Sequence, residues 1–89
     1  MRNYEIQPSL AKKLKKISKK DKVAFEAVMN KIMDVVKTDN VEHYKNLRYN
    51  MKDSKRVQLG HFVLVFLYDK AKDFISFEDY DHHDNIYKK

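Results

Sequence analysis

The sequence predicts an α+β domain whose elements follow the order β-α-α-β-β-β, with a small antiparallel-dominated sheet and an N-terminal helical hairpin packed on one face. Three observations lead to this prediction. Apolar residues recur at helical spacing over residues 10–36, strand-like alternation and apolar runs occupy residues 55–80, and Gly60 separates the first two of these strands. The 89 residues include one Gly and one Pro and contain no linker, so we expect a single domain over residues 1–89.

The N-terminal residues predict a strand followed by a helix. Tyr4 and Ile6 alternate with polar neighbours within Asn3–Gln7, which is the period of a half-buried strand. Pro8 favours a helix start, because the N–H that it lacks would have no partner in the first turn of a helix. Lysines cover most of this helix, and its apolar face consists of Leu10, Leu14 and Ile17 beside Ala11.

A second amphipathic helix follows directly. Asp21 is suited to cap its N-terminus, because a carboxylate accepts hydrogen bonds from the free N–H groups of the first turn. The helix is expected to end near Lys37–Asn40. Its apolar stripe consists of Phe25, Val28, Met29, Ile32, Met33 and Val36. Two such helices joined at a tight corner form a hairpin that needs a hydrophobic surface to pack on.

The second half of the chain supplies that surface. Residues 43–54 are polar and irregular and predict a loop. In the strand that follows, Arg56 and Gln58 lie on the face opposite Val57 and Leu59.

The last two strands complete the predicted sheet. Phe62–Tyr68 is apolar on both sides, so we expect this strand or its neighbour at the centre. A hairpin within Asp69–Asp73 leads to Phe74–Tyr80, whose apolar content decreases towards its end.

The charge of the chain is basic and unevenly distributed. The net charge is +6, residues 12–22 hold seven lysines and one aspartate, and residues 78–84 hold four carboxylates. A basic balance suggests an anionic partner such as RNA, DNA or an acidic protein, although solvated lysine faces are also common in stable small proteins.

There is no Cys, which excludes disulfides and thiolate metal sites. No apolar run approaches the roughly 20 residues of a membrane span, and the first residues lack the apolar core of a signal peptide, so we expect a cytoplasmic protein without membrane contact.

The second half also carries a recognisable family pattern. Arg56–Gly60 reads basic, hydrophobic, polar, hydrophobic, Gly; the aromatic and aliphatic strand His61–Phe66 follows; and Asp81–Tyr87 places a histidine a few residues before a tyrosine. Together with Lys45–Asn50 before these strands, the pattern resembles the RelE/ParE family of toxins from toxin–antitoxin pairs. The resemblance covers nearly the whole chain in element order and implies a single RelE-like domain.

The resemblance implies one of two activities. RelE-like members cleave mRNA on the translating ribosome, whereas ParE-like members poison DNA gyrase, and the two share one scaffold. Position by position, Arg56 matches a basic residue of the first family strand, His82 the histidine of the final segment, and Tyr87 the C-terminal tyrosine.

Three other family positions depart from the pattern. The Arg of the second strand is Val63 here, a basic position of the first strand is Gln58, and the Arg after the histidine is His83. Either the histidines have taken over the acid–base work, or the activity is weak or altered.

The matched residues suit cleavage of RNA by its own 2′-OH. That reaction needs a base for the hydroxyl, an acid for the 5′-oxygen and positive charge beside the pentacoordinate phosphate. Histidine can serve as base or acid, Arg56 can present a planar fork to the phosphate, and Tyr87 can stack on a base or donate its phenolic proton. The candidate catalytic residues are therefore Arg56, His82, His83 and Tyr87.

The two histidines leave alternatives open. Consecutive residues point to opposite faces of a strand, so both reach one phosphate only if the strand ends near Tyr80 and the chain turns. A structural interpretation is also open, in which the histidines are surface hydrogen-bonding or helix-capping groups, Asp81 or Asp84 pairs with a lysine, and Tyr87 covers the edge of the core.

A second basic group precedes the strands, and we expect it to contact RNA; it consists of Lys45, Arg48, Lys52 and Lys55. The lysines of the first helix are either a solvated face or a surface that docks on ribosomal RNA. We expect no metal and no other cofactor, because the adjacent residues Asp81–Asp84 rarely converge on one ion.

The sequence therefore predicts a RelE-like toxin, an endoribonuclease (mRNA interferase) that cleaves mRNA at the ribosome without metal, inhibits translation and is neutralised by a cognate antitoxin. The antitoxin is expected to lay an acidic or amphipathic segment over the sheet and the basic surface. The alternative is a non-catalytic relative or a ParE-like, gyrase-directed toxin that acts by binding protein. Val63 and Gln58 favour this alternative, whereas the Asp81–Tyr87 segment favours the nuclease.

Overall fold

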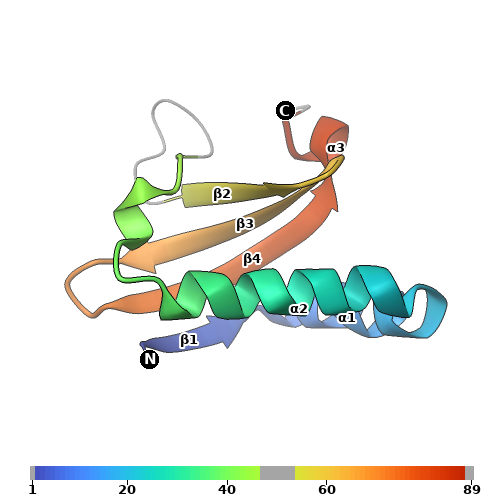
Figure 1. Cartoon of the computed structure of the whole chain (residues 1–89), viewed down its shortest axis with the longest axis horizontal. Helices are drawn as coiled ribbons and strands as arrows, with labels where there is room; N and C mark the ends of the chain where they lie inside the picture. Colours follow the sequence, from blue (N-terminus) through green and yellow to red (C-terminus); the bar gives the residue numbers. More distant parts are fainter. Residues whose placement is uncertain (1, 47–53, 88–89) are drawn as a thin grey trace.

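The computed structural model describes residues 2–46 and 54–87 and has the predicted order of elements, with a short 3-10 helix and a C-terminal helix in addition (Figure 1). The elements are β1 (Asn3–Ile6), α1 (Pro8–Lys20), α2 (Lys22–Lys37), the short 3-10 helix η1 (Val41–His43), β2 (Ser54–Leu59), β3 (Phe62–Asp69), β4 (Phe74–His82) and α3 (His83–Tyr87). The α+β class and the N-terminal helical hairpin are confirmed. Within the described residues no helix has the length and apolar content to span a membrane.

The four strands form one sheet in the order β1-β4-β3-β2. β1 runs parallel to β4, and the other two pairs are antiparallel, so the sheet is antiparallel-dominated as predicted. The strand Phe62–Tyr68, expected at or next to the centre, lies within β3, which is one of the two interior strands. The register shifts between Val65 and Phe66, which leaves Glu78 of β4 without a direct partner on β3.

The turn between β2 and β3 consists of Gly60 and His61. Gly60 has a φ of 61°, a left-handed conformation that glycine adopts without strain. The turn that Gly60 predicts is therefore present.

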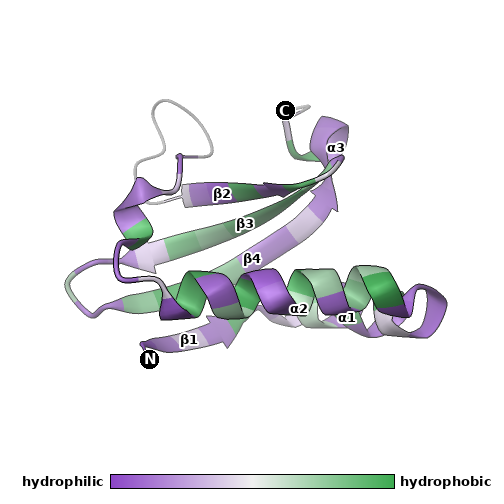
Figure 2. Cartoon of the chain, viewed as in Figure 1, coloured by the Kyte–Doolittle hydropathy of each residue, from purple (hydrophilic) through white to green (hydrophobic). Residues whose placement is uncertain are grey.

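The two long helices lie together, with α1 against β4 (Figure 1), and their buried residues share one core with Leu64 and Phe66 of β3. Asp21 caps α2, because its Oδ1 accepts a hydrogen bond from the Ala24 N–H at 3.1 Å. Green, apolar positions in Figure 2 mark α2 and much of β3, whereas α3 is mostly purple and polar. The buried core consists of Leu10, Leu14, Val28, Ile32, Val35, Val36, Val41, Leu64, Phe66, Ile75, Phe77 and Tyr80.

The opposite face of the sheet, which we call the open face, is turned away from the helical hairpin. Leu64 and Phe66 of β3 belong to the core, so the alternating residues Val63 and Val65 lie on the open face. Arg56 of β2 is the cross-strand partner of Val65, which places its side chain on the open face too.

Arg2, which precedes β1, is bonded to the C-terminal end of α2 and to the turn between β3 and β4. Its Nη1 donates hydrogen bonds to the carbonyl oxygens of Val35, Val36 and Thr38 at 3.4, 2.9 and 2.5 Å, where α2 ends. Its Nε donates to the Asp73 carboxylate at 2.9 Å, in the turn before β4. A cation at a helix C-terminus satisfies carbonyl groups that have no partner within the helix.

Candidate functional site

The end of the chain differs from the sequence-based expectation in one respect. The predicted strand Phe74–Tyr80 is present, but β4 continues to His82, and α3 begins at His83. The backbone N–H of His83 donates to the His61 carbonyl at 2.8 Å, so α3 starts beside the β2–β3 turn. The condition for both histidines to meet at one phosphate, a strand that ends near Tyr80, is not met.

His82 caps the N-terminus of α3. Its Nδ1 accepts a hydrogen bond from the backbone N–H of Asp84 at 3.2 Å, which satisfies one of the free N–H groups of the first turn. Nδ1 can accept this bond only when it carries no proton. The ring lies 6.2 Å from the His61 ring and 5.6 Å from the Phe62 ring, between centroids.

Arg56, Tyr87 and His83 form a row that we call the open-face cluster. The guanidinium carbon of Arg56 lies 5.8 Å from the centre of the Tyr87 ring, within the range of a cation–π contact. The Tyr87 ring lies 4.7 Å from the His83 ring, since residues four apart share one side of a helix. Nε of Arg56 and the hydroxyl of Tyr87 are buried and have no hydrogen-bond partner among the described residues.

The structure thus separates the two histidines. His83 joins the open-face cluster, whereas His82 alternates with Tyr80 along β4 and lies on the helical side of the sheet. Both remain close to one carboxylate, with the Nδ1 atoms of His82 and His83 lying 3.7 and 3.5 Å from the oxygens of Asp84. The assignment of one histidine to the cluster could not be made from the sequence.

Asp81 anchors α3, and its predicted pairing with a lysine is present. Its Oδ1 accepts hydrogen bonds from the His82 N–H at 2.7 Å and the Asn85 amide at 3.0 Å, and its Oδ2 accepts from Lys13 at 3.1 Å. The Asn85 amide holds the pKa of the Asp81 carboxyl below its ordinary value, with help from His82 and Lys13 and against the effect of burial. Lys13 and Asn85 carry no sequence signal for this role.

Lys13 reaches Asp81 from α1. Its Nζ also lies 2.6 Å from Oδ1 of Asp79. Burial alone would lower the pKa of the Lys13 ammonium, but the hydrogen bonds to Asp79 and Asp81 raise it above its ordinary value. This cation therefore connects α1 to the carboxylates near the end of β4.

The predicted RNA-binding group is only partly described. Arg48 and Lys52 lie outside the described residues. Lys45 is exposed, and its carbonyl accepts the backbone N–H of Arg56 at 2.9 Å. Lys55 is 7% exposed, and its ammonium donates to the Tyr44 carbonyl and the Asn46 side chain, both at 3.3 Å. Lys55 and Arg56 are neighbours in β2, so their side chains lie on opposite faces, and the structure does not bring them together.

Val63 and Gln58 stand where the family pattern has further cations, and neither side chain carries a charge. Val63 is fully buried, and the Gln58 amide donates to the Gly60 carbonyl at 3.0 Å. Neither position adds a cation to the open face beside Arg56. In the described part of the chain, no three His, Asp or Glu side chains are grouped so that they could hold a metal ion.

A relative in sequence matches the chain over its full length. It is the protein of Methanocaldococcus jannaschii described as "Putative toxin RelE4", which is 49% identical over 90 residues that cover 100% of this chain and 94% of that protein. No model of a known protein family matches the sequence.

Solved structures of RelE toxins share the fold. The isolated Escherichia coli RelE toxin matches with a TM-score of 0.74 at 15% identity, over 92% of this chain and 84% of that one. A chain of the intact Escherichia coli RelBE toxin–antitoxin complex matches with a TM-score of 0.73 at 15% identity, over 92% and 96% of the two chains. At this identity the likeness concerns the fold.

Proposed function

Since the chain belongs to the RelE family of toxins, we propose that it is the toxin of a toxin–antitoxin pair and that it cleaves mRNA on the ribosome. The observation that carries the proposal is the open-face cluster, in which a guanidinium, a phenol and an imidazole lie in a row on one face of the sheet. These groups supply what transesterification by the 2′-OH of RNA needs, namely positive charge and groups that transfer protons.

Arg56 is proposed to bind the scissile phosphate. A guanidinium offers two parallel N–H donors to phosphate oxygens and keeps its charge at any relevant pH. Nε of Arg56 is buried without a partner among the described residues, and an unsatisfied buried donor is costly. A phosphate oxygen at this position would satisfy the donor and stabilise the charge that develops on the phosphorane.

His83 and Tyr87 are proposed to move the protons. In the proposed step the imidazole of His83 takes the proton of the 2′-OH, and the 2′-oxygen forms a bond to phosphorus. The bond from phosphorus to the 5′-oxygen breaks, and the Tyr87 hydroxyl donates its proton to that oxygen. The products are a 2′,3′-cyclic phosphate and a 5′-hydroxyl, after which solvent restores both side chains. His82 keeps the structural role of a helix cap.

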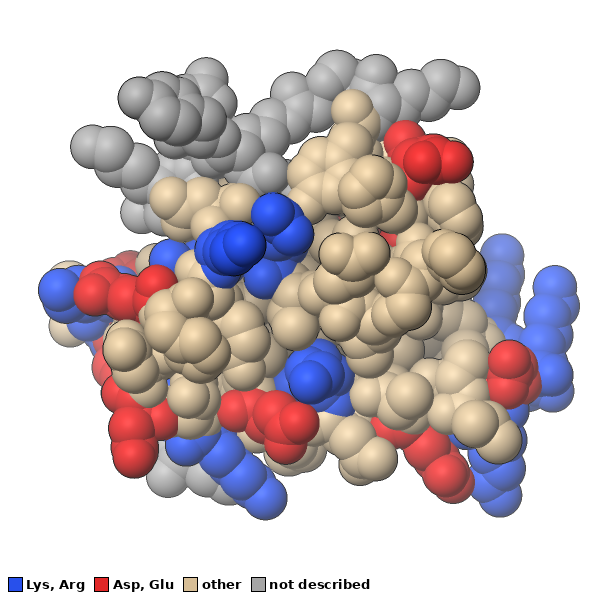
Figure 3. All heavy atoms as spheres, turned by 45° about the horizontal axis from the view of Figure 1, so that its top comes forward, with Lys and Arg blue, Asp and Glu red and all other residues tan. Residues whose placement is uncertain are grey.

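The lysines of α1 are proposed to dock on ribosomal RNA. Six of the seven lysines of residues 12–22 lie in α1, and long basic side chains project at the right of Figure 3, the side on which α1 and α2 meet in Figure 1. Contacts to phosphates release counterions, so we expect ribosome binding to weaken steeply as salt concentration rises.

The proposed neutralising partner is an antitoxin. The similar Escherichia coli RelE is found with its antitoxin in the RelBE complex. An acidic or amphipathic segment laid over the open face would cover Arg56 and complement the net charge of +6.

A second candidate function is a non-catalytic or gyrase-directed toxin. It is favoured by Val63 and Gln58, which replace two cations of the family pattern. Val63 is buried and the Gln58 amide is bonded to Gly60, so the open face has fewer cations to stabilise a phosphorane than the family pattern provides. This candidate assigns no role to the contact between His83 and Tyr87.

A reconstituted translation reaction with a defined mRNA tests the choice. We expect cleavage only when ribosomes are present, with products that end in a 2′,3′-cyclic phosphate and a 5′-hydroxyl. A parallel assay of DNA supercoiling by gyrase should show no effect. Intact mRNA combined with blocked supercoiling would select the gyrase-directed toxin, and intact mRNA with both processes unaffected would select the non-catalytic relative.

A further inference from the structure

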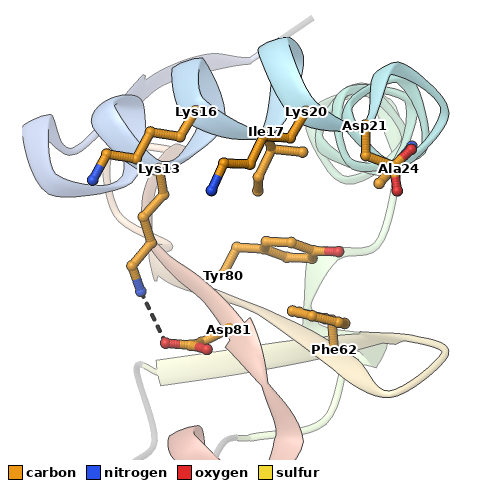
Figure 4. A pocket seen from close by; sticks show the side chains of 9 residues that line it. All are labelled: Lys13, Lys16, Ile17, Lys20, Asp21, Ala24, Phe62, Tyr80 and Asp81. Atoms are coloured by element: carbon orange, nitrogen blue, oxygen red, sulfur yellow. Dashed lines mark hydrogen bonds and ion pairs between the residues drawn. The ribbon is translucent and has the colours of Figure 1, made fainter.

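A groove lies on the helical side of the sheet, away from the open-face cluster (Figure 4). It is bounded by α1, by the start of α2 and by the adjoining ends of β3 and β4, and its volume is about 450 Å³. This size falls within the range of small-molecule sites, roughly 300–1,000 Å³. Its upper wall is α1 with Ile17, and below Ile17 lie the rings of Tyr80 and Phe62.

The floor of the groove is a pair of parallel aromatic rings. Tyr80 and Phe62 have centroids 5.1 Å apart and ring planes 17° apart. Tyr80 is 8% exposed and belongs to the core, whereas Phe62 is 39% exposed at the start of β3. A partly exposed ring stacked on a buried one is a rigid platform on which another planar ring can stack.

Lysines line one side of this platform. Lys13, Lys16 and Lys20 recur at spacings of three and four residues along α1 and extend beside the groove in Figure 4. Lys13 is held by Asp79 and Asp81. Lys16 and Lys20 are exposed and form no ion pair with a described residue, so both ammonium groups can bind an anion.

Two carboxylates border the groove as well. Asp21 and Asp81 lie at opposite ends of the groove in Figure 4, and each offers oxygens that accept hydrogen bonds. Such acceptors suit a planar ring with N–H groups at its edge. A nucleobase that carries a phosphate combines such a ring with the anion that Lys16 and Lys20 can bind.

We propose that this groove binds one nucleotide of a single-stranded RNA, with the base stacked against the Phe62–Tyr80 pair and the adjoining phosphate at Lys16 and Lys20. The site goes beyond the proposed cleavage, because it lies on the other side of the sheet from Arg56 and requires no reaction. It rests on the proposed docking of the α1 lysines on RNA and gives that contact a base that is held and not cut.

Fluorescence anisotropy with a labelled 2′-O-methyl hexanucleotide tests the site. This probe cannot be cleaved through its own 2′-OH, so binding is measured whether or not the protein is a nuclease. Phe62→Leu keeps an apolar side chain and removes the ring, and we expect it to weaken binding about tenfold, as the loss of one stacked base does. Lys16→Gln combined with Lys20→Gln should weaken binding at least fivefold.

A matched control removes the same charge elsewhere. Lys70 and Lys72 lie in the β3–β4 turn, at the end of β3 opposite Phe62. Lys70→Gln combined with Lys72→Gln should change the dissociation constant less than twofold. Equal losses of RNA affinity in the two double variants would show that only net charge attracts RNA and would overturn the proposal. Unchanged RNA binding by Phe62→Leu would overturn it too. A parallel measurement uses an acidic antitoxin peptide as the ligand, and groove variants that weaken binding of this peptide but leave RNA binding intact would also overturn the proposal.

Discussion

The side-chain amide of Asn85 donates a hydrogen bond to the carboxylate of Asp81 at 3.0 Å, and this bond ties α3 to the end of β4. Lys13 of α1 donates to the same carboxylate. α3 has five residues, and a helix of that length is not stable without tertiary contacts. Because α3 carries His83 and Tyr87, the surroundings of Asp81 determine where these two residues of the open-face cluster lie.

Replacing Asp81 by Ala should loosen α3. The change removes the acceptor for Asn85 and leaves Lys13 with Asp79 alone, so we expect a loss of about 1–2 kcal/mol in the free energy of unfolding. Hydrogen exchange of the α3 amides should become faster than in the unmodified protein. Asp79→Ala is the control, since it removes one partner of Lys13 and keeps the bond to Asn85. Equal protection of α3 in both variants would contradict the anchoring role of Asp81.

Acid should destabilise the protein partly through Asp81. Hydrogen bonding by Asn85 lowers the pKa of this carboxyl from its ordinary value of 3.8, so the charged form is favoured in the folded state. The resulting stabilisation is complete above the ordinary pKa and is lost as the pH falls through the lowered, folded-state pKa. Urea unfolding of Asp81→Asn should depend less steeply on pH below about 4 than unfolding of the unmodified protein.

The pH dependence should become shallower in this variant without disappearing. Asp73 also has a pKa below its ordinary value, because Arg2 and Tyr68 donate hydrogen bonds to its carboxylate. Identical pH profiles for Asp81→Asn and the unmodified protein would show that Asp81 contributes nothing to acid sensitivity.

The His82→Asn variant should keep most of the proposed mRNA cleavage. Asn is among the preferred residues at a helix N-cap, because its side-chain oxygen accepts the N–H bond that Nδ1 of His82 accepts here. We expect His82→Asn to cleave mRNA within about threefold of the unmodified rate, and His83→Asn to lose about 100-fold, a typical contribution of a general base. Initial cleavage rates in a reconstituted translation reaction measure both. A large loss with His82→Asn would mean that His82 takes part in the chemistry.

Arg2→Ala should lower stability without direct contact with the cluster. The guanidinium donates hydrogen bonds to three carbonyl oxygens at the end of α2 and to the carboxylate of Asp73, and the Arg2 side chain is 11% exposed. We expect a loss of about 2–3 kcal/mol, since the carbonyl groups lose a charged donor. Urea unfolding measures this loss. Lys37→Ala removes an exposed cation of the same helix end and should cost less than about 1 kcal/mol; a similar cost for the two changes would contradict the capping role of Arg2.

Most of the fold is predictable because the pattern of apolar residues is regular. The α1 and α2 stripes, the Asp21 cap and the Gly60 turn are local signals, and each is present in the structure. The parallel pairing of β1 with β4 is not a local signal, since it joins Asn3 to Phe74 across most of the chain. The sequence could therefore predict the strands without giving their order.

The site was less predictable, for physical reasons. α3 is short and has no apolar stripe, so no periodic pattern in the sequence predicts a helix there. Lys55 would be expected in solvent, but Tyr44 and Asn46 accept its hydrogen bonds and allow its burial. The separation of His82 from His83 follows from the residue at which β4 ends, and boundaries of elements are what sequence patterns determine least well.

The most direct test of the central claim is the rate of mRNA cleavage on ribosomes by Arg56→Ala, compared with Lys72→Ala. Lys72 is an exposed cation in the β3–β4 turn, so the two variants lose equal charge at different places. If the open-face cluster stabilises the phosphorane, Arg56→Ala should cleave at least 100-fold more slowly while its circular dichroism spectrum stays unchanged, and Lys72→Ala should retain the full rate. Undiminished cleavage by a folded Arg56→Ala protein would contradict the account.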